Sequence, residues 1–190
     1  MLLENKVAVI TGGAKGMGKS MALKFAEEGC SVAIADISID EAKENIAEIK
    51  QKGGSGLAFE CDVTRIDQVK NVVDGVLDEY GKVDILVNNA GGMPETPPIE
   101  DITEEDWDKV FALNLKSDFF FCKYIVPQMK ERKYGKIINL SSIGAINPPA
   151  HAIHYNTAKA AIIGFTYDLA RALASYNICV NAILPGPVRT

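Results

Sequence analysis

The sequence predicts an α/β protein built on a doubly wound parallel β-sheet. Short apolar runs alternate along the chain with segments in which apolar residues recur at helical spacing. The first apolar run, Val7 to Ile10, breaks into a glycine-rich turn and continues as a helical pattern. Strands that alternate with helices in this order favour a parallel sheet with right-handed crossovers.

The composition favours one domain over residues 1–190. The chain of 190 residues is 47% hydrophobic, which is enough for one sizeable core, and no segment has the composition of a linker. The net charge of -5, with Lys and Arg scattered among acids, argues against a nucleic-acid partner. No run approaches the roughly 18 apolar residues of a membrane span, and the first strand begins too early to follow a secretory leader. We therefore expect a cytoplasmic protein without a membrane partner.

The glycine-rich turn predicts a dinucleotide site. Gly12, Gly16 and Gly18 follow the first strand with the spacing GxxxGxG, and a helix with Gly29 as its C-cap comes next. Residues without a Cβ let a ligand approach the backbone, and a helix N-terminus offers unpaired amides and a positive dipole end to a pyrophosphate. The alternative is a turn that only closes the strand–helix unit.

The second strand, Ser31 to Ala35, ends at Asp36. This acid follows the last glycine at the spacing at which a carboxylate meets the ribose hydroxyls of adenosine, although it could also be an ordinary surface residue. Ser38 and Glu41 then have the spacing of a capping box, which predicts a helix that stops at Gly53.

The next two strands also end in polar residues. Leu57 to Cys61 leads to Asp62, and Thr64 with Asp67 predicts the N-cap of a helix that closes at Gly81. The fourth strand, Val83 to Val87, runs into Asn88-Asn89-Ala90-Gly91.

A proline-containing loop from Gly92 to Ile99 separates this strand from a long helix. Thr103 and Asp106 predict its capping box, and its apolar side is too wide for a single contact. Pro127 lies well inside the pattern, so a kink or break is expected near Val126.

The last third of the chain contains two more strands and one helix. Lys136 to Leu140 is the fifth strand and is followed by Ser141 and Ser142. Tyr155 to Ala174 is a long helix, and the sixth strand, Ile178 to Leu184, is broken by Pro185-Gly186-Pro187.

Four motifs stand in one order along this chain. They are TGGAKGMG, Asn88-Asn89-Ala90-Gly91, Ser142 with Tyr155-Asn156-Thr157-Ala158-Lys159, and Pro185-Gly186-Pro187-Val188-Arg189-Thr190. Together they resemble the short-chain dehydrogenase/reductase family over the whole chain, which implies a Rossmann-like fold. Members of that family normally continue past the Pro-Gly motif into a substrate-covering loop and a seventh strand. The resemblance therefore implies that the chain is truncated, or that this segment lies outside the sequence.

Tyr155 and Lys159 have the spacing of neighbours on one helix face. A nearby cation favours the phenolate form of a tyrosine, so Tyr155 could act as general acid for carbonyl reduction and general base for alcohol oxidation. Ser142 could donate a hydrogen bond to the substrate oxygen as charge develops there. The alternative for Tyr155 and Lys159 alone is an amphipathic surface pair.

The resemblance implies the same catalytic roles and adds others. It implies that Lys159 also binds the nicotinamide ribose, and that Asn114 holds a water in a proton relay. The cofactor-binding residues it implies, beyond Tyr155 and Lys159, are Gly12, Lys15, Gly16, Met17, Gly18, Asp36, Asp62, Val63, Asn89, Ala90, Gly91, Pro185, Gly186, Val188 and Thr190. The family assembles through the helices around Trp107 to Met129 and Tyr155 to Ala174, so a homo-oligomer, a tetramer at full length, is expected.

The expected cofactor is NAD rather than NADP. Asp36 would accept hydrogen bonds from both ribose hydroxyls and would repel a 2′-phosphate. Lys15 could offset part of that repulsion, but the residue after Asp36 is Ile37, where an Arg or Lys would grip the phosphate. The expected function is an oxidoreductase acting on a small secondary alcohol or ketone. A 3-oxoacyl thioester (acyl carrier protein) reductase and a non-catalytic dinucleotide-binding protein of the same fold are the alternatives.

Other candidate ligand residues point to no metal site. His151 and His154 are three apart without further ligands, so we expect them near the mouth of the site, where one could touch substrate. The other possible metal ligands are cysteines far apart in the sequence, which we expect to be buried free thiols: Cys30, Cys61, Cys122 and Cys179.

Overall fold

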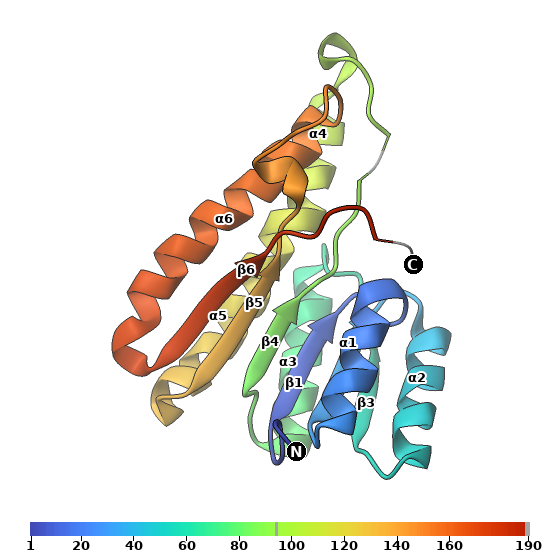
Figure 1. Ribbon diagram of the computed structural model, residues 1–190, viewed down its shortest axis with the longest axis vertical. Coiled ribbons are helices and arrows are strands. Elements are labelled where there is room, and N and C mark those ends of the chain that lie inside the picture. The colour runs from blue at the N-terminus through green and yellow to red at the C-terminus, as the bar shows by residue number, and fades with distance from the viewer. Residues whose placement is uncertain (94, 189–190) are drawn as a thin grey trace.

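The computed structural model describes residues 1–93 and 95–188, and in it six parallel strands form one sheet. The strand order is β3-β2-β1-β4-β5-β6 (Figure 1). Their bounds are Val7–Thr11 for β1, Ser31–Asp36 for β2, Gly56–Glu60 for β3, Ile85–Asn88 for β4, Gly135–Leu140 for β5 and Ile178–Ile183 for β6. The predicted doubly wound parallel sheet is confirmed.

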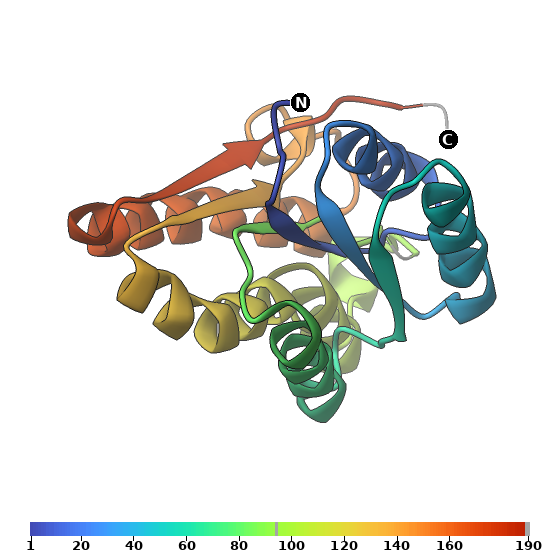
Figure 2. The same cartoon turned by 90° about the horizontal axis from the view of Figure 1, so that it is seen from below.

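Helices cover both faces of this sheet. Figure 2 shows α1 and α2 on one face, and α3, α5 and α6 on the other. Their bounds are Gly16–Glu27 for α1, Ile39–Gln51 for α2, Ile66–Tyr80 for α3, Glu104–Phe111 for α4, Ser117–Arg132 for α5 and Ile153–Leu173 for α6. Short 3-10 turns at Ile99–Asp101, Ile143–Ala145 and Ala174–Tyr176 complete the described helical elements, with one π-helical segment at Ala112–Lys116.

The hydrophobic core consists of two layers because successive strand residues point to opposite faces. In β1, Val7 and Val9 pack into the layer beneath α3, α5 and α6, whereas Ala8 and Ile10 pack into the layer beneath α1 and α2. All five residues of β1 are buried, as expected for the centre of a parallel sheet covered on both faces.

Asp84 ties together the amino-terminal ends of three strands. Its carboxylate accepts hydrogen bonds from the Val7 amide at 3.0 Å and from Arg132 Nη1 at 2.6 Å, and it forms a salt bridge with Lys82 at 3.0 Å. Its carbonyl accepts from the amide of Lys136. Burial alone would raise the pKa of Asp84, but the hydrogen bonds from Arg132, Lys82 and Val7 outweigh burial and hold it below its usual range.

Of the three helix N-termini for which side-chain caps were predicted, one has its predicted cap. Thr103 accepts from the Asp106 amide, and the Asp106 carboxylate accepts from the Thr103 amide. The other two predictions are wrong because their side chains have different partners. The carboxylate of Glu41 pairs with Lys15 instead of the Ser38 amide, and the hydroxyl of Thr64 donates to Asp62.

Of the kink or break expected near Val126, the break is absent. Helix α5 continues through Pro127, and the irregularity lies one helix earlier, in the π-helical segment Ala112–Lys116. Packing keeps α5 continuous, since Phe121, Ile125 and Met129 are fully buried in the core. π-Bulges often occur at functional sites, and this one contains the fully buried Asn114.

Two glycines end helices as expected, and one cysteine differs from its expectation. Gly29 and Gly81 have φ values of +88° and +69° just after α1 and α3, as predicted for helix ends. Three of the four cysteines are buried free thiols, but Cys179 is an exposed free thiol on β6. Within residues 1–93 and 95–188, no helix is both long and apolar enough to cross a membrane.

Candidate active site

The carboxyl ends of β1, β2, β3 and β4 surround a cleft of about 760 Å³. It lies beside the junction of β1 and β4, where the strand order reverses, which is the usual ligand site of a doubly wound sheet. The predicted binding residues that line it are Gly12, Lys15, Gly16, Met17, Gly18, Asp36, Asp62, Val63, Asn89, Ala90 and Gly91.

The glycines are needed because backbones approach closely at the floor of this cleft. Gly12 has a φ of +62°, and a Cβ there would lie 3.0 Å from the Cα of Ala90. A Cβ on Gly18 would clash with the carbonyl oxygen of Gly12. A larger residue at either position would displace the turn from β4.

Thr11 and Asn89 fasten the end of β1 to the end of β4. The Thr11 hydroxyl accepts from the amides of Asn89 and Ala90, both at 2.9 Å, and donates to the Val87 carbonyl. The Asn89 amide group donates to the carbonyls of Thr11 at 2.8 Å and Gly12 at 2.9 Å. The turn and the Asn-Asn-Ala-Gly segment therefore form one rigid floor.

Helix α1 begins in this floor and can receive an anion. No side chain caps its N-terminus, and its first turn contains no acidic residue. Its first amides and the positive end of its dipole therefore remain available for a pyrophosphate. With the glycine cradle, this fits the dinucleotide that the sequence predicts.

Asp36 lies at the end of β2 and is fixed by two backbone amides. Its carboxylate oxygens accept from Ala14 and from Ser38, each at 2.9 Å. Lys15 lines the same cleft, but its ammonium pairs with Glu41 at 2.7 Å. The acid is therefore positioned at the predicted place, and the neighbouring cation has a different partner.

Lys159 is buried beside Tyr155. Its Nζ donates to the Leu140 carbonyl at 2.8 Å and lies 5.8 Å from the centroid of the Tyr155 ring. Burial lowers the pKa of Lys159, and the charge of the buried Asp118 partly opposes this. Helix α6 thus holds the cation next to the half-buried tyrosine, as the spacing predicts.

Asn114 braces the segment after β4. Its side chain accepts from the Gly92 amide at 3.1 Å and donates to the carbonyls of Gly92 and Val110, both at 3.0 Å. A Cβ on Gly91 would lie 2.7 Å from Asn114 Oδ1 and 3.0 Å from Lys159 Nζ. Gly91 therefore allows the asparagine, the lysine and the cleft to come together.

Ser142 follows β5 and is oriented by its neighbours. Its hydroxyl accepts from the Gly144 amide at 3.1 Å. The hydroxyl of Ser141 donates to the Lys159 carbonyl at 2.7 Å, and the amide of Ile143 donates to the Pro185 carbonyl at 3.0 Å. The serine segment is thus held between α6 and the segment after β6.

The remaining predicted residues lie outside the lining of the cleft. Tyr155 and Lys159 are on α6, and Pro185, Gly186 and Val188 follow β6. Thr190 lies outside the described residues.

The expectation for the two histidines is wrong for His154. It is fully buried, and neither ring nitrogen has a hydrogen-bond partner among the described residues, whereas His151 is exposed. His154 forms part of the wall of a second cavity, about 450 Å³, between α4 and the segment after β4. This cavity shares Leu113 with the larger cleft. No group of three or more His, Cys, Asp or Glu side chains in the described part could hold a metal ion.

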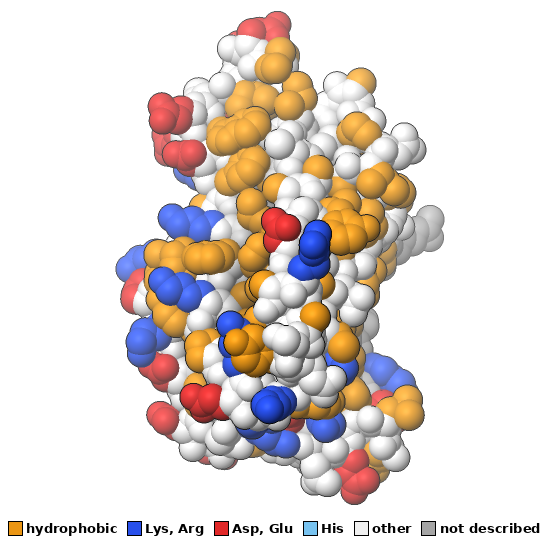
Figure 3. Space-filling model, turned by 90° about the vertical axis from the view of Figure 1, so that its left-hand side faces the viewer, with side chains coloured by type: hydrophobic (Ala, Val, Ile, Leu, Met, Phe, Trp, Pro, Cys, Tyr) orange, Lys and Arg blue, Asp and Glu red, His pale blue; other side chains and the backbone are white. Residues whose placement is uncertain are grey.

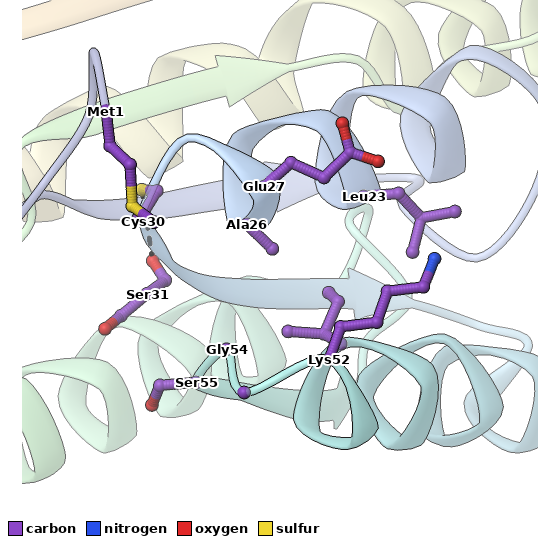
Figure 4. Close-up of a pocket in the computed structure, with 12 residues that line it drawn as sticks. Met1, Leu23, Ala26, Glu27, Cys30, Ser31, Lys52, Gly54 and Ser55 are labelled. Atoms are coloured by element: carbon purple, nitrogen blue, oxygen red, sulfur yellow. Dashed lines mark hydrogen bonds between the residues drawn. The ribbon is translucent and has the colours of Figure 1, made fainter.

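A third cavity, about 430 Å³, lies at the opposite end of the sheet (Figure 4). Its lining includes Cys30, Ser31 and Ser55 at the amino-terminal ends of β2 and β3, with Leu23 and Ala26 of α1. Its glycines, Gly29, Gly53 and Gly54, follow the C-terminal ends of α1 and α2, and no helix N-terminus in the described part of the chain lines it. We assign the candidate site to the larger cleft for this reason.

Some residues of the cleft had no distinct signal in the sequence. Ala35 and Leu113 line it without a polar or glycine motif of their own. Asn45 donates to the Ala14 carbonyl at 2.8 Å, yet it lies within an ordinary amphipathic pattern. Its position as a polar residue within the apolar stripe of the helix is the one sequence feature that could have indicated this contact.

Comparisons with known proteins identify the family. The short chain dehydrogenase family matches residues 6–190. The 3-oxoacyl-[acyl-carrier-protein] reductase FabG of Thermotoga maritima is 40% identical over 100% of this chain and 77% of its own length. The enzyme of the same name from Staphylococcus epidermidis is 42% identical over 96% of this chain and 75% of its own.

Two solved structures share the fold. An NAD+-bound xylitol dehydrogenase superposes with a TM-score of 0.93 at 35% identity, covering 98% of this chain and 72% of that one. A 7α-hydroxysteroid dehydrogenase complexed with NADH and 7-oxo glycochenodeoxycholic acid also has a TM-score of 0.93, at 37% identity, covering 97% of this chain and 71% of that one. The chain thus belongs to the short-chain dehydrogenase/reductase family and is an oxidoreductase that acts on CH–OH groups of small molecules.

Proposed function

We propose that this protein transfers a hydride between NAD and a secondary alcohol or ketone, with Tyr155 as general acid and base. The observation that carries the proposal is the buried ammonium of Lys159, 5.8 Å from the Tyr155 ring and next to Gly91 of the cleft. A cation beside a tyrosine can stabilise the negative charge that develops on the tyrosine oxygen during proton transfer.

Different residues of the chain would bind two parts of the adenosine diphosphate portion of the cofactor. The turn at Gly12, Gly16 and Gly18 would hold the pyrophosphate, and Asp36 the adenosine ribose. When bound, the cofactor supplies the carbon that accepts the hydride from the alcohol.

In the oxidation direction, Tyr155 takes the proton from the substrate hydroxyl, and in reduction it returns that proton to the carbonyl oxygen. Ser142 donates a hydrogen bond to the same oxygen, and Lys159 stabilises the negative charge on Tyr155. Asn114 is proposed to continue the proton path from Lys159 through a water.

Replacing Tyr155 tests this assignment. In Tyr155→Phe, the phenolic proton is lost while the ring and its packing remain, so kcat should fall by at least about 100-fold. The Kd for the cofactor, measured by fluorescence titration, should change less than about threefold. A variant that retains most of its turnover would contradict the role of Tyr155.

The cofactor preference follows from Asp36. We propose that its carboxylate accepts hydrogen bonds from both ribose hydroxyls and disfavours a 2′-phosphate. At about 4 Å and an effective dielectric constant near 20, two like unit charges repel by roughly 4 kcal/mol before screening. The two superposed enzymes are complexed with NAD+ and NADH, which supports this preference.

Titration with each cofactor checks the preference. NAD(H) should bind at least about tenfold more tightly than NADP(H), and Asp36→Ala should narrow that ratio because the repelling charge is gone. If NADP(H) bound the wild-type protein more tightly, the proposal for Asp36 would be wrong.

A 3-oxoacyl thioester is the second candidate substrate. It is favoured by the two relatives at 40% and 42% identity, whose names give that activity. Xylitol and steroid alcohols are the classes in the names of the superposed enzymes. A panel containing an acetoacetyl thioester, a polyol and a steroid alcohol, followed by nicotinamide absorbance, distinguishes these from each other and from a non-catalytic binding protein.

We further infer a homo-oligomer, a tetramer at full length, that assembles through α4, α5 and α6. Exposed apolar side chains on these helices include Trp107, Phe119 and Tyr167, and a cavity of about 550 Å³ lies between Phe119 and Phe165. Figure 3, which views the molecule from the α6 side, shows apolar side chains gathered on this face. Such a patch is typical of a subunit interface.

Light scattering tests the assembly. Phe119→Glu places a charge in the apolar patch and should reduce the mass of the assembly, whereas Glu131→Gln at the end of α5 should leave it unchanged. A monomeric wild-type protein would contradict the inference.

Four unpaired thiols fit a reducing compartment, which supports the proposal that the protein is cytoplasmic.

A further inference from the structure

Helix α2 presents two polar side chains to the glycine-rich turn. Glu41 and Asn45 are one helical turn apart and so lie on the same face. Asn45 is only 2% exposed, and its amide group donates to the carbonyls of Ala14 at 2.8 Å and Gly13 at 3.4 Å. This buried contact fixes the backbone immediately before Lys15.

Glu41 binds the side chain of that lysine. Its Oε1 lies 2.7 Å from Lys15 Nζ, and the lysine and glutamate side chains are 66% and 43% exposed. The hydrogen bond from Lys15 and its charge lower the pKa of Glu41, while the same hydrogen bond and the charge of Glu41 raise the pKa of Lys15. The two groups are therefore both charged at neutral pH.

The pair stands at the end of the cleft that Asp36 marks. Lys15, Asp36 and Ile37 line the same end, and the charge of Asp36 also acts on Lys15. Lys15 is the cation of this lining, so it is the group that would attract a 2′-phosphate on the adenosine ribose. A carboxylate that already holds its ammonium would weaken that attraction.

We propose that Glu41 is a specificity-determining residue that disfavours NADP by pairing with Lys15. The proposal rests on the proposed use of NAD and on the position of Asp36. Glu41 acts in two ways: it neutralises Lys15, the cation that lines this cleft among the described residues, and it adds a second negative charge near the site. An unphosphorylated ribose offers Lys15 no additional negative charge, so NAD binding should depend on the pair less than NADP binding does.

The expected size of the effect is modest. Exposed ion pairs are weak and are screened by salt, so releasing Lys15 changes the affinity for the phosphate only a few-fold. Asn45 fixes the backbone from which the lysine side chain extends, which holds Lys15 at the cleft.

Four proteins test the proposal: wild type, Glu41→Gln, Lys15→Met and the double variant. The Kd values for NADH and NADPH are measured by nicotinamide fluorescence at low and high ionic strength. Glu41→Gln should tighten NADPH about three- to fivefold and leave NADH within twofold. In the Lys15→Met background the same substitution should have less than half of this effect in free energy, and high salt should reduce it in both backgrounds.

Glu48→Gln is the matched control. Glu48 is on the same helix and pairs with Lys52 at the same distance of 2.7 Å, but neither residue lines the cleft. Its substitution should change neither Kd. The proposal is overturned if Glu41→Gln leaves the NADPH Kd unchanged, or tightens NADH and NADPH equally.

The two claims can fail separately. Tighter binding of NADPH than NADH by the wild type would contradict the proposed use of NAD. The comparison of Glu41→Gln with and without Lys15 would still show whether Glu41 restrains the lysine. An effect that is the same in both backgrounds would overturn the pairing mechanism itself.

Discussion

The contact between the ends of β1 and β4 is the constraint on which the rest of the site depends. Thr11 and Asn89 make five hydrogen bonds across this junction to backbone groups of the two strand ends. The bonds are possible only because Gly12 and Gly18 have no Cβ to separate the segments. Since the strand order reverses here, the same junction opens the cleft and starts helix α1 in its floor.

The proposed catalytic residues are positioned from the other side of this junction. Gly91 continues the Asn89 segment, and because it has no Cβ, Asn114 and Lys159 can both lie beside it, which brings helix α6 up to the cleft. The π-helical segment turns Asn114 toward that position, and the Ser141 hydroxyl fixes α6 against β5. The proposed hydride transfer and the proposed proton transfer can therefore take place at one point, where the cleft reaches α6.

The sequence predicted most of the fold and the identity of most lining residues, because both depend on local patterns. Apolar runs, helix-ending glycines such as Gly81, and polar residues after strands can be read without knowing the partners. The failures concern choices between competing partners. Glu41 could cap α2 or bind Lys15, and only the folded distance of 2.7 Å decides between them. His154 was expected at the mouth, but packing between α6 and α4 buries it, and Pro127 is tolerated because the core holds α5.

Hydrogen exchange with and without saturating NAD most directly tests the claim that the β1–β4 junction builds the cofactor site. The account predicts slower exchange in the segments 12–18, 36–38, 62–64 and 89–91, which line the cleft. Segments 23–26 and 53–55, around the cavity at the opposite end, should exchange at the same rate in both samples. Protection confined to those opposite-end segments, with none in the cleft, would contradict the account.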